Sequence, residues 1–197
     1  MAMILASQSP RRRELLGQMG FSFTVRPAKG EELPHPELTP AQLVEELARQ
    51  KALEVSAGAD ADDVVVAADT VVAVDGKVLG KPHDKVHAAQ MLSALSGREH
   101  TVYTGVAVKR GETLLVEHEA TQVRFRPLTE REIDLYIQTG EPMDKAGSYG
   151  IQGYGALLVE GIRGDYFNVV GLPICRLGRM LLDFGVDCLA LAGGQSF

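Results

Sequence analysis

The chain has 197 residues, of which 45% are hydrophobic and 23% charged, a composition typical of a globular protein with one domain and a sizeable core. A net charge of −6 argues against a general binder of nucleic acid or acidic membranes, so an anionic substrate would need a local cluster of cations. Short apolar runs, the lack of a secretory pattern and two cysteines without metal-ligand spacing predict a reduced, cytoplasmic protein without a membrane span.

The first helix is predicted directly after a short apolar strand at residues 3–6. Ser9 and Pro10 form a helix start, with serine as N-cap and proline at the first helical position, and the helix should cover residues 11–18. Its first turn carries Arg11 and Arg12, although the helix dipole favours acids there. These arginines either lie on a solvated face or bind a phosphate together with the free N–H groups. The conflict with the dipole favours the phosphate site.

A second helix is predicted from Thr39 to about Ala57, after an edge strand and a polar loop that carries Glu31 and Glu32. Lys51 lies on or beside the apolar stripe of this helix. Its side chain therefore either extends along the helix to solvent or points into a cleft.

Residues 64–82 are the stretch around which the rest of the chain is organised. Their first five residues are apolar and predict a strand buried on both faces, which continues into Asp69 and Thr70. The pair Asp75-Gly76 predicts a two-residue hairpin turn, which would bring Lys81 opposite Thr70. An acid and a base at the end of buried strands form either a structural ion pair or half of an active site. A bulge or the long lysine stem would have to bring Lys81 to Asp69.

The second half of the chain predicts two helices, two long antiparallel strands, a glycine-rich segment, a short hairpin and a last helix. In chain order, they are expected at 84–95 (helix), 101–109 with 113–125 (strands), 129–140 (helix), 141–156 (glycine-rich), 157–159 with 166–170 (hairpin) and 174–184 (helix). Dense glycines let the backbone approach a ligand closely. The segment is either a mobile surface loop or a binding wall that uses Lys145, Ser148 and Gln152.

Helices and strands alternate early in the chain and cluster as long hairpins later, without an internal repeat or a linker. This order predicts an α/β fold in which a mixed twisted sheet is flanked by helices, in two lobes around a cleft. We expect one domain over residues 1–197, with a frayed tail from about residue 186.

The polar residues at the ends of these elements are of the types that handle phosphates. Arginine holds phosphate oxygens as a fork and lysine as a point charge, and Asp69 with Glu31 or Glu32 could bind a magnesium-like ion. Phosphoryl chemistry needs little more than cations that neutralise the phosphate chain, a metal ion and a carboxylate that orients water. The sequence contains no P-loop, no dinucleotide-binding glycine motif, no G-x-S-x-G motif and no histidine spacing that predicts a zinc site.

Seven motifs, in order, resemble those of the Maf family of nucleotide pyrophosphatases. They are S-x-S-P-R-R at 7–12, A-x-x-K-A at 48–52, A-D-T at 68–70, G-K-P at 80–82, S-G-x-x-H-x-V-x-T at 96–104, D-K-A-G-x-Y-G-I-Q-G at 144–153 and V-V-G-L-P at 169–173. The resemblance covers the chain from about Ile4 to Phe184, and the ordered set is far more specific than any one motif.

The resemblance implies a fold like that of the inosine triphosphate pyrophosphatases. It also implies hydrolysis of a nucleoside triphosphate to the monophosphate and pyrophosphate with a divalent cation, Mg, Mn or Co. Asp69 matches the catalytic carboxylate, which also binds the metal, and Glu32 matches the second acidic position, although the loop register leaves Glu31 open. The phosphate-binding groups of the family match Ser9, Arg11, Arg12, Lys51 and Lys81.

Thr70 and Gln152 resemble the family branch that acts on dTTP and UTP rather than on 7-methyl-GTP, and modified pyrimidine nucleotides are further candidate substrates. A side-chain amide offers both a donor and an acceptor to a pyrimidine edge. The resemblance further implies a homodimer and a nucleoside triphosphate as the binding partner. The composition already argues against nucleic acid or a membrane as a partner. One alternative is a nucleotide-binding regulator of cell division and septum formation without significant turnover. Another is a phosphatase that releases single phosphates.

Overall fold

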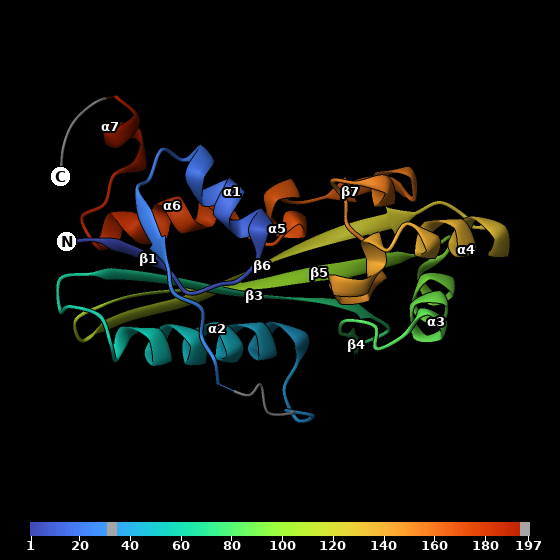
Figure 1. The fold of residues 1–197 in the computed structure, drawn as a ribbon, viewed down its shortest axis with the longest axis horizontal. Helices are drawn as coiled ribbons and strands as arrows, with labels where there is room; N and C mark the ends of the chain where they lie inside the picture. Colours follow the sequence, from blue (N-terminus) through green and yellow to red (C-terminus); the bar gives the residue numbers. More distant parts are fainter. Residues whose placement is uncertain (31–34, 194–197) are drawn as a thin grey trace.

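A computed structural model describes residues 1–30 and 35–193, which form a seven-stranded mixed sheet with helices on both faces (Figure 1). The strands are β1 (Met3–Leu5), β2 (Phe23–Val25), β3 (Val64–Val74), β4 (Lys77–Leu79), β5 (Glu99–Arg110), β6 (Thr113–Phe125) and β7 (Val159–Arg163). The helices are α1 (Pro10–Gln18), α2 (Pro40–Ser56), α3 (Lys85–Leu95), α4 (Glu130–Gln138), α5 (Tyr166–Val170), α6 (Ile174–Asp183) and α7 (Cys188–Ala192).

The strand order is β2-β1-β3-β5-β6-β7, and β4 pairs with β3 as a hairpin. β1 runs parallel to both of its neighbours, β2 and β3, whereas the pairs β3–β5, β5–β6 and β6–β7 are antiparallel. The long strands β3, β5 and β6 run along most of the length of the molecule (Figure 1). Helix α2 covers one face of the sheet, α1, α5 and α6 cover the other, and α3 and α4 lie at the far end (Figure 1). This arrangement confirms the predicted α/β fold class.

Strand β3 contributes to three hydrophobic clusters and is polar where they meet. Residues 64, 66 and 68 pack in a cluster with α1 and α6, and residues 72 and 74 pack in a cluster with α3 and α4. Residues 65 and 67 pack on the opposite face against α2, so the strand is buried on both faces as predicted. Asp69 and Thr70 are the two half-buried residues of an otherwise buried strand. Their alternating directions place Asp69 on the α2 face and Thr70 on the other face, between the two clusters.

The hairpin after β3 has the predicted turn. Asp75 and Gly76 both have positive φ, 51° and 75°. The register pairs Val74 with Lys77 and places Leu79 opposite β3, but β4 ends at Leu79, two residues before Lys81. The predicted pairing of Lys81 with β3 is therefore wrong, because the hairpin opens before it reaches the polar residues.

Helices α1, α2 and α4 begin at the predicted residues. Pro10 begins α1 directly after Ser9, which has the extended backbone of an N-cap but whose side chain makes no capping hydrogen bond. Thr39 forms a reciprocal capping box with Gln42 at α2, and Thr129 begins α4 in the same way.

The predicted hairpin of residues 157–159 and 166–170 is wrong. Residues 166–170 form α5, and the Asp165 carboxylate caps this helix by accepting from the N–H of Phe167 at 2.8 Å. A short apolar run does not distinguish a strand from a buried helix turn. Here the cap that Asp165 provides stabilises the helix. β7 pairs with β6 instead. The segment from about residue 186, for which frayed structure is predicted, contains α7, whose N-cap is Asp187.

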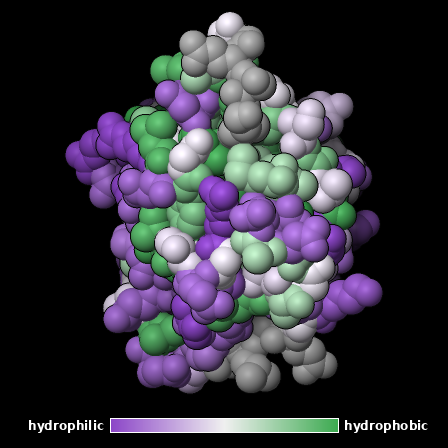
Figure 2. Space-filling model, turned by 90° about the vertical axis from the view of Figure 1, so that its left-hand side faces the viewer, coloured by the Kyte–Doolittle hydropathy of each residue, from purple (hydrophilic) through white to green (hydrophobic). Residues whose placement is uncertain are grey.

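The surface mixes charged and apolar side chains. Figure 2 shows hydrophilic and hydrophobic residues interspersed over the end of the molecule on the left of Figure 1. Within the described residues, no helix combines the length and the apolar composition that crossing a membrane requires.

Candidate active site

A cavity of about 880 Å³ opens beside the polar residues of β3. Its walls come from the turn after β1, from α2, from the loop after β4, from the glycine-rich segment and from the turn between α5 and α6. The volume suits a nucleotide-sized ligand. Of the nine predicted site residues, Glu32 lies outside the described residues, and the other eight line this cavity: Ser9, Arg11, Arg12, Lys51, Asp69, Thr70, Lys81 and Gln152.

Asp69 forms an ion pair with Lys51. The Nζ atom of Lys51 lies 2.5 Å from Oδ1 of Asp69, and the two side chains are 20% and 13% exposed. Lys51 therefore points into the cleft rather than along the helix to solvent. The sequence predicts Lys81 as the partner of Asp69. This prediction is wrong, because among the described residues the ion pair of Asp69 is with Lys51. Lys81 is exposed on another wall of the same cavity.

Gly105 sets the separation between α2 and the sheet. It pairs with Asp69 across β3 and β5, on the face that α2 covers. A Cβ atom at this position would lie 2.1 Å from the carbonyl oxygen and 2.3 Å from the carbonyl carbon of Val44, in the backbone of α2. Only glycine allows this approach, which brings Lys51, two turns further along α2, to the carboxylate.

Arg12 joins three segments at the base of the cavity. Its Nε donates to the carbonyl oxygen of Gly171 at 2.7 Å, and its Nη1 donates to Ser7 Oγ at 3.2 Å and to the carbonyl oxygen of Ala68 at 2.8 Å. Its Nη2 donates to Thr70 Oγ1 at 2.9 Å. The guanidinium thus holds the β1–α1 turn and the α5–α6 turn against β3. A further role in phosphate binding stays a prediction.

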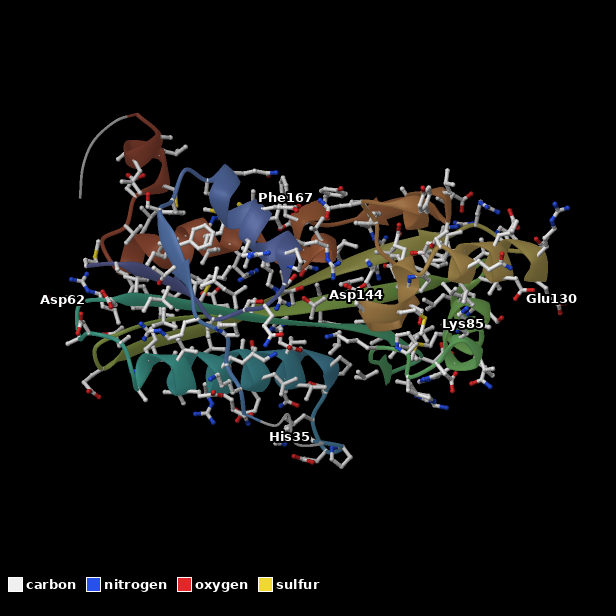
Figure 3. All side chains as sticks on the ribbon, viewed as in Figure 1. His35, Asp62, Lys85, Glu130, Asp144 and Phe167 are labelled. Carbon is white, nitrogen blue, oxygen red and sulfur yellow. The ribbon has the colours of Figure 1, made fainter. Side chains whose placement is uncertain are left out.

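Arg11 reaches across the cavity to the glycine-rich segment. Its Nη1 lies 3.7 Å from Oδ2 of Asp144, a residue of that segment that is labelled in Figure 3. Burial raises the pKa of Asp144, but the hydrogen bond and charge of Lys145, together with the charge of Arg11, outweigh it and lower the pKa. Because the contact is long and Asp144 is largely exposed, an anionic ligand can replace Asp144 as the partner of Arg11.

The hydroxyl group of Thr70 belongs to a chain of hydrogen bonds with a fixed direction. Thr104 Oγ1 donates its hydrogen to the carbonyl oxygen of Asn168 at 3.0 Å. Thr70 Oγ1 lies 2.9 Å from Thr104 Oγ1, so Thr70 is the donor of that bond, and it also accepts from Arg12. A hydroxyl has one hydrogen and two lone pairs. Thr70, which lines the cavity, therefore keeps one lone pair that these bonds do not use, and this lone pair is an acceptor.

His100 supports the cavity wall from behind. Its Nε2 lies 2.8 Å from the hydroxyl oxygen of Tyr149, which lines the cavity, and the rings of Phe125 and Tyr149 pack edgewise against it. Burial lowers the pKa of His100 from 6.5 to about 4. The folded protein therefore holds a neutral imidazole at this position.

This burial predicts a component of acid sensitivity. Unfolded His100 takes up a proton as the pH falls through 6.5, whereas folded His100 takes it up only near pH 4. Its contribution to stability is complete above pH 6.5 and decreases below it, by about 2 kcal/mol of unfolding free energy between pH 7 and pH 5. Urea unfolding at both pH values should therefore show a loss of unfolding free energy that is larger by about this amount in the wild type than in His100→Gln. Equal losses in both proteins would contradict the assignment.

Several residues of the site are missed by sequence reasoning. Tyr149 and Thr104 lie within quoted motifs, but no spacing marks them as neighbours of the cavity. Ser148, expected in the binding wall, is buried and its Oγ lies 3.1 Å from Sδ of Met91, so that part of the expectation is wrong. Gln152, by contrast, is exposed and lines the cavity as the binding-wall alternative predicts.

The donor set fits part of a site for a divalent cation. Among the described residues, no group of three or more His, Cys, Asp and Glu side chains could hold a metal ion. Magnesium commonly uses one or two carboxylates and completes its shell with substrate phosphates and water. Asp69, with one oxygen on Lys51, offers one such carboxylate.

Comparison with known proteins gives a consistent result over more than nine tenths of the chain. A family model described as Maf-like protein matches residues 2–184. The chain is 55% identical over 188 residues to the dTTP/UTP pyrophosphatase of Moorella thermoacetica, covering 94% of this chain and 96% of that protein. It is 53% identical over 184 residues to the dTTP/UTP pyrophosphatase of Bacillus pumilus, covering 93% and 97%.

A solved structure shares the fold. The HAM1 protein from Coxiella burnetii aligns with a TM-score of 0.50 over 93% of this chain and 100% of that chain, at 15% identity. At this identity, the likeness shows the fold alone.

Proposed function

The chain belongs to the Maf family, and from this premise we propose that it is a nucleoside triphosphate pyrophosphatase acting on dTTP and UTP. The products are the nucleoside monophosphate and pyrophosphate. One observation carries the proposal: the cavity combines a carboxylate held by Lys51 with further cations from separate elements. In an acidic protein, such a cluster of cations marks a site for an anionic ligand.

The cations bind the triphosphate. Arg11 at the start of α1 exchanges Asp144 for a phosphate oxygen, and Lys51 and Lys81 supply point charges from two other walls. The backbone N–H groups at the start of α1 add donors to the same region. These groups neutralise the charge that accumulates on the phosphates as the bond breaks.

Asp69 orients the attacking water and accepts its proton. The water oxygen attacks the α-phosphorus, the bond from the α-phosphorus to the bridging oxygen breaks, and pyrophosphate leaves with that oxygen. Lys51 holds one carboxylate oxygen at 2.5 Å and so fixes the direction of the other. Asp69 and Glu32 are the residues that would hold a divalent cation, which when bound adds positive charge beside the phosphates.

Thr70 and Gln152 select the base. The lone pair of Thr70 suits the N3–H donor of thymine or uracil and disfavours N3 of cytosine, which is an acceptor. The exposed amide of Gln152 supplies a donor and an acceptor to the same edge. The homodimer and the cytoplasmic location stay predictions.

A panel of triphosphates with identified products tests the proposal. The enzyme is incubated with Mg²⁺ or Mn²⁺ and one triphosphate at a time. The expected substrates are dTTP, UTP and pyrimidine triphosphates with a modified base, such as a 5-methyl base, and the comparison substrates are CTP, GTP and 7-methyl-GTP. We expect the monophosphate and pyrophosphate from dTTP and UTP. Binding without any turnover would instead support the regulator of cell division, and release of orthophosphate with a diphosphate would support a phosphatase.

A further inference from the structure

A carboxylate behind the cavity wall collects hydrogen bonds from the glycine-rich segment. Oε1 of Glu141 accepts from the hydroxyl of Tyr136 and from the N–H of Gly155, both at 2.9 Å. Oε2 accepts from the N–H of Tyr154 at 2.8 Å. Glu141 itself is not among the residues described as lining the cavity.

The same carboxylate also reaches the other end of the segment. The hydroxyl of Tyr136, which donates to Glu141, accepts from the N–H of Gly150 at 3.2 Å. Residues 150–155 are therefore tied at both ends to Glu141, directly at one end and through Tyr136 at the other. Gln152 lies between the two anchors, exposed in the cavity.

The glycines of this segment are fitted to the carboxylate. A Cβ atom on Gly153 would lie 2.1 Å from Oε2 of Glu141. A Cβ atom on Gly155 would lie 2.4 Å from the carbonyl oxygen of Gly150 and 2.8 Å from the hydroxyl of Tyr136. The backbone can curl around the carboxylate only because these positions lack side chains.

The negative charge strengthens these bonds. Burial raises the pKa of Glu141, but the N–H groups of Gly155 and Tyr154 and the hydroxyl of Tyr136 outweigh it and leave the pKa below its ordinary value. A carboxylate accepts with both oxygens, whereas a glutamine amide would turn an N–H₂ donor toward one of the N–H groups.

We propose that Glu141 is the positioning residue for base recognition: it shapes residues 150–155 so that Gln152 faces the base. This inference rests on the proposed function of the cavity. It assigns no role to Glu141 in contacting the phosphates, so its loss affects recognition of the base and spares recognition of the phosphate chain.

The test compares Glu141→Gln with the wild type and with Glu130→Gln, a control at an exposed residue of α4. We expect Glu141→Gln to raise KM for dTTP about tenfold with little change in kcat, which corresponds to losing one charge-assisted hydrogen bond. The preference for dTTP over CTP should fall by a similar factor. Inhibition by inorganic tripolyphosphate, which has no base, should stay unchanged, and Glu130→Gln should resemble the wild type.

Two results would overturn the inference. One is an unchanged KM and base preference in Glu141→Gln. The other is an equal loss of tripolyphosphate affinity, which would mean that the whole cleft has been disturbed. If Glu141→Gln does not fold, Tyr136→Phe removes the link to Gly150 and is judged by the same two criteria.

Failure of the proposed function has a separate signature. A wild-type enzyme that does not hydrolyse dTTP contradicts the proposed function but leaves Glu141 testable. In that case, calorimetric affinities for dTTP, CTP and tripolyphosphate replace KM, with the same expected pattern and the same contradicting results.

Discussion

Replacing Asp69 by asparagine is expected to lower kcat for dTTP by about a thousandfold while the protein stays folded. Asparagine has nearly the same shape, and its Oδ1 can still accept from Lys51, so the contact between α2 and β3 persists. The amide, however, is no base and cannot take the proton of the attacking water. Steady-state release of pyrophosphate, with the circular dichroism spectrum and thermal midpoint of each protein, measures both parts.

The matched control is Asp134→Asn, which makes the same chemical change on an exposed position of α4. It should leave kcat and KM unchanged. The assignment of Asp69 would be wrong if Asp69→Asn released pyrophosphate at a rate close to that of the wild type, or if both variants lost activity equally.

Replacing Gly105 by alanine is expected to lower both stability and activity. The new Cβ atom would lie 2.1 Å from a backbone carbonyl oxygen of α2, so the helix must move away from the sheet. Overpacking of this kind costs about 1–3 kcal/mol, and we expect the upper end because the obstacle is backbone. The movement also takes Lys51 away from Asp69. The free energy of unfolding, measured with a denaturant, and the rate of dTTP hydrolysis should both decrease.

Gly161→Ala is the control for this prediction. Gly161 also lies in a strand, β7. A Cβ atom at this position would have no other atom of the described residues within 4 Å. We expect it to be close to neutral in stability and activity. If Gly105→Ala were as stable and as active as Gly161→Ala, the close approach of α2 would not position the site.

The sequence predicts the centre of the site because its polar residues interrupt a buried strand. Asp69 and Thr70 stand out within an apolar run, and Arg11 and Arg12 stand out against the helix dipole. The partner of Asp69 is harder to predict. The stripe of α2 leaves Lys51 with two directions, and only the packing of α2 on Gly105 decides between them.

The errors have local causes. The prediction for Lys81 assumes that the β3–β4 ladder continues to this residue, whereas the ladder ends at Leu79. Residues 166–170 are too few for their periodicity to separate helix from strand. The partners of Glu141 are N–H groups 13 and 14 residues further along the chain, and backbone donors carry no signal in a sequence. Their geometry depends on the fold of the whole segment.

Hydrolysis of dTTP in ¹⁸O-labelled water tests the central claim most directly, because it reports which phosphorus atom the water attacks. If the cavity directs a water held by Asp69 at the α-phosphorus, mass spectrometry should find the label in dTMP and none in pyrophosphate. Label in pyrophosphate, or release of labelled orthophosphate, would contradict the account.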